Sequence, residues 1–494
     1  MKRLFVLFTI AFLVMPAALW AAGGAEKAGP GKIVAYVLDA TESSQAARQE
    51  VDAAANQILG KKLNITVEWK RFDWSYGEKL QLAIAAKEDF DTFFTCYWVN
   101  EPYSKSALDE SLAALDDLLP KYGPWILKNR ATALDMARIN GKIYAVPGKM
   151  DVNSAGNFYI VKEMAEKYKI DTSGFKTWAD IEKIATTLKA EKDFVPLRPW
   201  TGVMGFYPLK EMGIENTNLR FVAYDVKNKK IIRVQQKPEY AQYYKMVRRW
   251  AEEGLMGSKA DLAEMAYEKI QKNSAAGKYL MFSQEFSPKI ELMQQDQAGR
   301  SLVPLLMTDD IFLQPNAAWG TMQAVPAWSK NKERAVAYLN ELASNPDLYN
   351  LLAYGIKDKH YTVSGKGDAT PIDVKKGGYA SFDWMWGLNP FGLTFAPQTR
   401  PKWSYALGAE KTLKPALLAG FIVDPDKYQN EIANLDPPAF EALATQLAIG
   451  WPADGKSSVE DLLAQMDQVL KEYKWPAFQA QLQKDVDAFL SAKK

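Results

Sequence analysis

Three apolar segments alternate with two helical segments near the start of this chain, and this order constrains its fold most. Residues 32–38, 64–70 and 91–97 have the β-branched and aromatic content of strands. Residues 45–59 and 76–87, which lie between them, have apolar side chains at helical spacing. The order strand, helix, strand, helix, strand indicates a parallel sheet covered by helices, and therefore an α/β fold.

The ends of these strands are where we expect a binding site. Ligands of parallel sheets bind beyond the carboxyl ends of the strands. The loops that follow the three expected strands are residues 39–44, 71–75 and 98–103, and they carry carboxylate and aromatic side chains. We therefore expect these loops to contribute to a ligand site.

The first residues have the order of a secretory signal peptide. Lys2 and Arg3 precede an apolar run over residues 4–15, Pro16 ends that run, and small residues follow at 21–24. A membrane anchor is the alternative, but a span needs about 20 apolar residues. We expect a signal peptide over residues 1–22 and a flexible leader over 23–31.

The position of the single cysteine indicates whether the exported chain carries a lipid anchor. Cys96 is the only cysteine, and none follows the apolar run closely enough to carry a lipid. We therefore expect a periplasmic or secreted protein without a lipid anchor. A single thiol forms no intramolecular disulfide, and we expect it to be buried.

Size and charge narrow the class of protein. About 470 residues remain after the leader, which is more than one compact core holds, so at least two domains are expected. Without Lys2 and Arg3 the basic residues fall from 61 to 59 and equal the 59 acidic ones. This balance, together with the absence of a basic block, argues against binding to nucleic acid or to an anionic membrane surface.

The rest of the chain gives further structural predictions. Thr177 and Asp180 have the spacing of a helix capping pair. Crossings between domains are expected near residues 147–148 and 319–320. Helices are predicted over 238–254, 332–344 and 439–449, strands over 278–283 and 302–307, and a hairpin over 224–234 with its turn at 227–229.

Three stretches, taken in order, resemble the family 1 extracellular solute-binding proteins of ABC importers. They are NGKIYAVPG at 140–148, RRWAEEGLM at 248–256 and AVPAWSKNKERAVAYLNELASNPDLYNLLAYGIKDKHYT at 324–362. The chain is most similar to sugar-type members with an additional C-terminal region. The resemblance covers essentially the whole chain after the leader, and it rests on order and spacing instead of one diagnostic motif.

The resemblance implies a periplasmic-binding-protein-like type II fold, with two α/β lobes, a hinge and a central ligand cleft. Lobe one would span 30–148 plus 322–354, and lobe two 152–318 plus 358–494, including a C-terminal helical region. The implied function is capture of a small polar solute, expected to be an oligosaccharide, by lobe closure. The implied partner is a membrane permease of an ABC transporter, and a monomer is expected.

Motifs of enzymes and of cofactor sites fit the chain poorly. Residues 450–457 satisfy the phosphate-loop pattern GxxxxGKS, but they follow a predicted helix instead of a strand. Ser457 and Glu460 are instead predicted to cap the next helix. His360 is the only histidine, which leaves no HExxH pair for zinc and favours a hydrogen-bonded turn residue. We expect no cofactor and no metal.

Carboxylates leave two functions open. Asp39, Glu42, Asp73, Glu101 and Asp151 lie in loops at strand ends or at the first crossing. A glycoside hydrolase needs only two such groups, whereas a receptor uses them to accept hydrogen bonds from sugar hydroxyls. The resemblance favours the receptor over the enzyme. A sensor that reports to a membrane receptor is a third alternative.

Aromatic side chains supply the remaining candidates, because the apolar face of a sugar ring stacks on an aromatic plane. With 15 Trp and 23 Tyr the chain has more than core packing usually needs. The predicted ligand-binding residues are Asp39, Glu42, Trp74, Tyr97, Trp98, Glu101, Asp151, Asn153, Trp200, Trp319, Trp384 and Trp386. Trp74, Trp98 and Trp319 are preferred because they follow strands or crossings.

Overall fold

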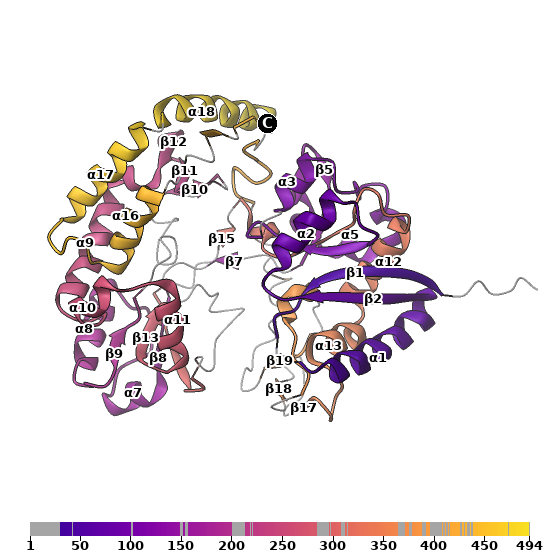
Figure 1. Cartoon of the computed structure of the whole chain (residues 1–494), viewed down its shortest axis with the longest axis horizontal. Helices are drawn as coiled ribbons and strands as arrows, with labels where there is room; N and C mark the ends of the chain where they lie inside the picture. Colours follow the sequence, from indigo (N-terminus) through magenta and orange to yellow (C-terminus); the bar gives the residue numbers. More distant parts are fainter. Residues whose placement is uncertain are drawn as a thin grey trace, which may run out of the picture.

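The computed structural model places two α/β lobes side by side (Figure 1). It describes residues 30–493 except 42, 100–101, 149–151, 154–156, 200–212, 218, 220, 284–295, 297, 308–311, 314, 364–370, 375–377, 388–391, 396–407, 409–410, 412, 414, 425–426, 429, 432–434, 436–437 and 473. The expected signal peptide and nearly all of the leader therefore lie outside the described residues. Within the described part of the chain, no helix is long and apolar enough to cross a membrane.

The first lobe is built on a five-stranded sheet with the order β2–β1–β3–β16–β6. These strands are β1 (Gly31–Leu38), β2 (Ile65–Phe72), β3 (Thr92–Thr95), β16 (Met322–Ala324) and β6 (Ala145–Pro147). Strand β1 pairs in parallel with both β2 and β3, and β16 is antiparallel to β3 and β6. Helices α1 (Gln45–Leu63) and α2 (Tyr76–Ala85) connect the parallel strands. The alternation predicted from the sequence is confirmed.

Local chemistry explains the limits of α1. Ser44 Oγ accepts a hydrogen bond of 3.2 Å from the Ala47 N–H and so caps the first turn. Asn64 ends the helix with a left-handed backbone (φ 52°), which asparagine adopts more readily than most residues. Val51, Ala55 and Leu59, spaced four apart, are buried.

Shorter elements complete the first lobe. They are α3 (Tyr103–Leu108), α4 (Leu119–Tyr122), α5 (Pro124–Asn129), α6 (Ala131–Met136), β4 (Arg138–Ile139), β5 (Lys142–Ile143), η2 (Ala317–Trp319), α12 (Lys332–Ser344), α13 (Pro346–Tyr354), β17 (Tyr361–Val363), β18 (Pro371–Val374), η3 (Asp383–Trp386) and β19 (Thr394–Phe395). His360 is a buried turn residue whose Nδ1 accepts from the Ile356 N–H at 2.9 Å, and Cys96 is buried, both as predicted.

The second lobe combines a four-stranded sheet, a three-stranded sheet and a helical C-terminal region (Figure 1). The strands are β8 (Phe158–Val161), β9 (Val195–Leu197), β13 (Tyr279–Ser283) and β14 (Leu302–Leu305) in one sheet, and β10 (Ile214–Asn216), β11 (Val222–Asp225) and β12 (Lys230–Arg233) in the other. The helices are α7 (Lys162–Lys167), α8 (Trp178–Leu188), η1 (Val234–Gln236), α9 (Pro238–Glu252), α10 (Lys259–Ala263), α11 (Tyr267–Ala275), α16 (Pro438–Ile449), α17 (Val459–Glu472) and α18 (Trp475–Ala492). The predicted hairpin corresponds to β11 and β12.

Two predicted helix caps have different outcomes. Thr177 and Asp180 exchange side-chain and backbone hydrogen bonds at the start of α8, which confirms that capping pair. At α17 the prediction was wrong by one residue. Ser458 and Asp461 form the cap, because Ser457 instead donates to the Asp454 carboxylate in the preceding loop.

The chain crosses between the lobes as a short antiparallel ribbon of β7 (Val152–Asn153) and β15 (Phe312–Leu313), which lies between the lobes in Figure 1. At its first-lobe end, the Gly148 N–H donates to the Thr321 carbonyl at 2.6 Å. A Cβ on Gly148 would lie 2.6 Å from Thr321 Oγ1 and 3.0 Å from the Gly387 Cα. The crossings therefore pack through glycine backbone at this point.

Two separate hydrophobic cores show which segments belong together. Tyr361, Tyr379 and Trp386 join the first core, although residues 358–494 were expected in the second lobe. The reason is that this segment bonds to α13, since the Tyr379 hydroxyl donates to the Leu352 carbonyl at 2.8 Å. Residues 317–319 also pack in the first core instead of the second.

Candidate ligand-binding site

Four aromatic side chains form a continuous surface on the first lobe, here called the aromatic wall: Trp74, Phe382, Trp384 and Trp98. Ring centroids are 5.7 Å apart between Trp74 and Phe382, 5.0 Å between Phe382 and Trp384, and 6.0 Å between Trp384 and Trp98. The buried ring of Phe94 lies beneath, within 5.7 Å of Trp98 and 5.9 Å of Trp384. Residues far apart in the sequence thus make one surface.

Strand ends explain the position of the wall. Trp74 follows the end of β2 by two residues, and Trp98 follows the end of β3 by three. Figure 1 shows that β1 and β2 point toward the second lobe. The wall therefore stands at the carboxyl edge of the sheet, on the side of the lobe where a ligand of a parallel sheet is expected.

Exposure distinguishes the wall from core packing. Trp74 is 65% exposed, Trp98 is 42% exposed and the adjacent Tyr97 is 45% exposed, and Phe382 and Trp384 are half-buried. Large aromatic rings in mutual contact and open to water leave apolar area unburied, which marks a binding surface. The prediction of Trp74, Tyr97, Trp98 and Trp384 as site residues is consistent with this exposure and stays a prediction.

The backbone of the second crossing fixes the orientation of Trp98. Its Nε1–H donates to the Gly320 carbonyl at 2.8 Å, and the Tyr97 N–H donates to the Trp319 carbonyl at 3.0 Å. The polar atom of the Trp98 indole is therefore satisfied by protein, while much of the ring is left in water. A ring held in this way can stack on an apolar ligand face without losing side-chain freedom.

Three other predicted residues are too buried to touch a ligand in this structure. Trp319 is 1% exposed, with its Nε1–H bonded to the Met136 carbonyl at 2.9 Å. Trp386 is 3% exposed and donates to Ser381 Oγ at 2.7 Å. Asp39 is 4% exposed. These side chains face inward, each held by a protein partner, which does not favour a ligand contact; their place in the ligand site stays a prediction.

The remaining predicted residues are not described. Glu42, Glu101, Asp151 and Trp200 lie outside the described residues. Asn153 belongs to strand β7, but its side chain is likewise outside the description. Their participation stays a prediction.

Sequence reasoning missed Phe382, the residue that joins Trp74 to Trp384. Its signal was its position two residues before Trp384, in the aromatic stretch at 382–386. Only the packing of that stretch against β3 brings it beside Trp74, which lies more than 300 residues earlier in the chain.

Asp73 carries the carboxylate directly before Trp74. It accepts hydrogen bonds from the Ser75 side chain and from the Ser75 N–H (3.0 Å). These hydrogen bonds lower the pKa of Asp73 below its usual value. Asp73 is therefore an ionised acceptor at neutral pH, able to receive hydrogen bonds from hydroxyl groups.

In the loop that matches the phosphate-loop pattern, a side chain of the loop itself accepts the backbone hydrogen bonds. The Asp454 carboxylate accepts from the Lys456 N–H at 2.8 Å and the Ser457 N–H at 2.9 Å. The hydrogen bonds from Ser457 and Lys456 lower the pKa of Asp454 to about 2. The two N–H groups that would face a phosphate are already used, and the preceding element is helix α16. Among the described residues, no group of three His, Cys, Asp or Glu side chains could hold a metal.

Comparisons with known proteins bear on the whole chain. No family model matches it. A curated relative, a carbohydrate ABC transporter substrate-binding protein of Streptococcus pneumoniae serotype 4, is 26% identical over 469 residues, which cover 90% of this chain and 89% of the relative. The resemblance to solute-binding proteins of ABC importers is confirmed by this match.

Solved structures share the fold. The N-glycan transport solute binding protein of Streptococcus pneumoniae superposes with a TM-score of 0.75 at 21% identity, covering 94% of this chain and all of the other. The substrate-binding protein FusA of the same organism, solved with kestose, gives 0.57 at 14% identity, again covering 94% and 100%. The two-lobed α/β fold expected from the sequence is thereby confirmed.

Proposed function

We infer that this chain is a solute-binding protein of an ABC importer and that it captures an oligosaccharide on the aromatic wall. The observation that carries this inference is the exposed wall at the carboxyl edge of the sheet. It occurs in a chain that matches a carbohydrate receptor over nearly its full length. The relatives named above are binding proteins for carbohydrates, and the wall gives this chain a surface suited to the same chemistry.

The geometry of the wall favours several linked sugar rings. A pyranose presents C–H groups on one face, and this face stacks on an aromatic plane. Neighbouring rings of the wall lie 5.0–6.0 Å apart, about the distance between adjacent units of a sugar chain. A single monosaccharide would cover one or two of these rings and leave the others exposed.

Capture proceeds by closure of the two lobes about the crossings. The sugar binds first to the wall, and the second lobe then covers it, so that contacts made by both lobes stabilise the closed form. Gly148 and Gly387 approach each other beside Thr321 at the first-lobe end of the crossings, and neither glycine has a side chain that would obstruct rotation there. The closed protein, exported and monomeric, then delivers the sugar to a membrane permease.

A hydrolase is less well supported. A glycoside hydrolase needs an acid whose pKa is raised, whereas the pKa of Asp73 is lowered. Asp39 is held between two arginines inside the lobe. Asp73 therefore suits hydrogen bonding to a sugar, Asp39 is engaged inside the lobe, and we propose that the protein is not an enzyme.

Thermal-shift screening of residues 23–494 against short gluco-, manno-, galacto- and fructo-oligosaccharides tests this function. A bound sugar at 100 times its dissociation constant adds about 2.7 kcal/mol of stability and raises the melting temperature. Chromatography of the same mixtures checks for products. A shift without products supports a receptor, and cleavage of any sugar in the panel would contradict it.

A further inference from the structure

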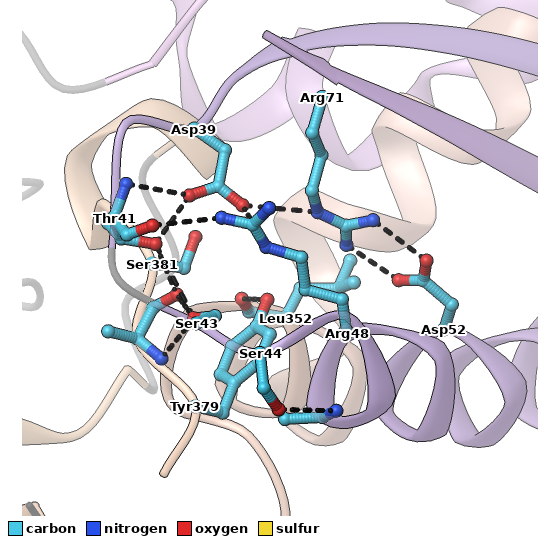
Figure 2. A network of polar contacts seen from close by, with 12 residues as sticks. Asp39, Thr41, Ser43, Ser44, Arg48, Asp52, Arg71, Leu352, Tyr379 and Ser381 are labelled. Carbon is cyan, nitrogen blue, oxygen red and sulfur yellow. Dashed lines mark hydrogen bonds and ion pairs between the residues drawn. The ribbon is translucent and has the colours of Figure 1, made fainter. Parts of the chain in front are cut away.

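A buried charge cluster lies at the end of β1 (Figure 2). Asp39 Oδ2 is 3.2 Å from Arg48 Nε and 3.3 Å from Arg71 Nε. Arg71 also makes a two-pronged contact with Asp52 on α1, with N–O distances of 2.7 and 2.6 Å. The Asp39 side chain is 1% exposed and that of Arg71 is 8% exposed. Buried ion pairs with this geometry hold their elements in one arrangement.

The cluster fixes the loop between β1 and α1. Asp39 Oδ1 accepts from the Thr41 N–H at 3.2 Å and from the Thr41 hydroxyl at 2.5 Å. The Thr41 carbonyl in turn accepts from Arg48 Nη2 at 3.0 Å. Asp39 is therefore a structural residue that organises the loop instead of a residue that touches the ligand.

The loop between β1 and α1 is hydrogen-bonded to the segment 379–386, which carries Phe382 and Trp384. The Ser43 hydroxyl donates to the Ala380 carbonyl at 2.6 Å, and Thr41 Oγ1, whose one proton goes to Asp39, lies 2.9 Å from the same carbonyl. The Ala380 N–H donates back to Ser43 Oγ at 2.7 Å. Phe382 follows Ala380 by two residues and Trp384 by four. Hydrogen bonds between residues more than 330 positions apart in sequence thus hold the start of the segment that carries these two rings.

Two further hydrogen bonds hold the same segment. The buried Tyr379 hydroxyl donates to the Leu352 carbonyl at 2.8 Å, and Trp386 donates to Ser381 at 2.7 Å. Burial raises the pKa of Tyr379 to about 12, so the hydroxyl stays protonated and keeps donating at physiological pH. Ala380 is exposed between these anchors, and its backbone contacts with Ser43 and Thr41 are the link to the charge cluster.

We propose that Ser43 is a positioning residue for the aromatic wall, and that the Asp39–Arg71 ion pair is the rigid base from which it acts. This inference rests on the proposed function for its effect on affinity. Ser43 does not touch the sugar. It holds Phe382 and Trp384 in register with Trp74 and Trp98 before the sugar arrives, and prior ordering of a site raises affinity by lowering the ordering cost of binding.

Hydrogen exchange on the free protein tests the positioning without any ligand. The reporter is the Met385 amide, which donates to the Phe382 carbonyl at 3.1 Å. Ser43→Ala is expected to speed the exchange of this amide about tenfold. The reason is that local opening of the segment then no longer requires breaking the two hydrogen bonds between Ser43 and Ala380. Ser43→Thr keeps the hydroxyl and should restore slow exchange. Unchanged exchange in Ser43→Ala would overturn the proposal.

The adjacent serine supplies a matched control. Ser44 Oγ faces α1 and caps it by accepting from the Ala47 N–H at 3.2 Å. Ser44→Ala should lower overall stability by the cost of a helix cap while leaving the Met385 amide as slow as in the wild type. If Ser44→Ala speeds that amide as much as Ser43→Ala does, the effect is general destabilisation and the positioning role is refuted.

A double-mutant cycle then tests the effect on binding. The probe is whichever fluorescently labelled oligosaccharide of the gluco-, manno-, galacto- and fructo- panel binds the wild type most tightly. Ser43→Ala should weaken its binding about tenfold, as expected for two lost hydrogen bonds. In a Trp384→Ala background the same change should have a clearly smaller effect, because one of the two rings that Ser43 positions is gone.

The outcomes separate the two claims. If no panel member binds the wild type, the proposed function fails, while the exchange result still decides the positioning. If the wild type binds and Trp384→Ala weakens binding, but Ser43→Ala does not, the proposed function stands and the positioning role of Ser43 is refuted. Equal effects of Ser43→Ala in both backgrounds would also refute it.

Discussion

Replacing Trp319 with alanine tests whether this indole belongs to the core. Its ring is fully buried, packs edge-on against Tyr103 with centroids 5.5 Å apart, and donates to the Met136 carbonyl at 2.9 Å. Truncation of a buried Trp costs about 3–5 kcal/mol, and the orphaned carbonyl adds to that cost. We expect Trp319→Ala to lower the unfolding free energy of the first lobe by about 4–5 kcal/mol.

Trp98→Ala is the matched comparison at the wall. Its ring is 42% exposed and touches Phe94 and Trp384, so its loss should cost only about 1–2 kcal/mol. Urea unfolding followed by far-UV circular dichroism measures both variants. An unfolding midpoint for Trp319→Ala that matches the wild type, or that equals that of Trp98→Ala, would refute the assignment of Trp319 to the core.

Three further predictions concern a cap, a charge and a crossing. Thr177→Ala should lower stability by about 1 kcal/mol in urea unfolding, because the capping pair of α8 is lost. The pKa of Asp454 is lowered to about 2, so its stabilisation of the Ser457 turn is complete above pH 4 and is lost as the pH falls through about 2. An NMR titration that gives Asp454 an ordinary pKa would contradict this. Gly148→Ala places a Cβ 2.6 Å from Thr321 Oγ1 and should slow closure in stopped-flow fluorescence with the oligosaccharide probe; wild-type rates would exclude a role for the close approach.

The sequence predicts regular elements well where one local signal decides them. The end of β1 and the start of α1 were predicted from β-branched content and helical spacing, although α1 continues to Leu63, four residues past its predicted end. The pairing of β1 with β2 and β3 follows from the connecting helices. At α17 the local pattern offered two adjacent serines. The choice of Ser458 depended on Asp454, which competes for Ser457.

The candidate site is harder to predict because exposure is a tertiary property. Trp98 and Trp319 both lie at strand or crossing ends, yet the first stays half-exposed and the second is buried by Tyr103 and Met136. Asp39 has the position of a ligand-binding carboxylate, but its neighbours Arg48 and Arg71 come from a helix and another strand. No local pattern contains those partners, so the sequence could not show that the charge was already neutralised.

Calorimetric titration of residues 23–494 with the tightest-binding panel oligosaccharide tests the central claim most directly. The protein variants are the wild type, the Trp74→Ala/Trp98→Ala double variant, and Phe175→Ala, which removes an aromatic ring that is 59% exposed on the second lobe. We predict one saturable site, at least about a thirtyfold loss of affinity in the double variant, and wild-type affinity in Phe175→Ala. Undiminished affinity in the double variant would contradict capture on the aromatic wall.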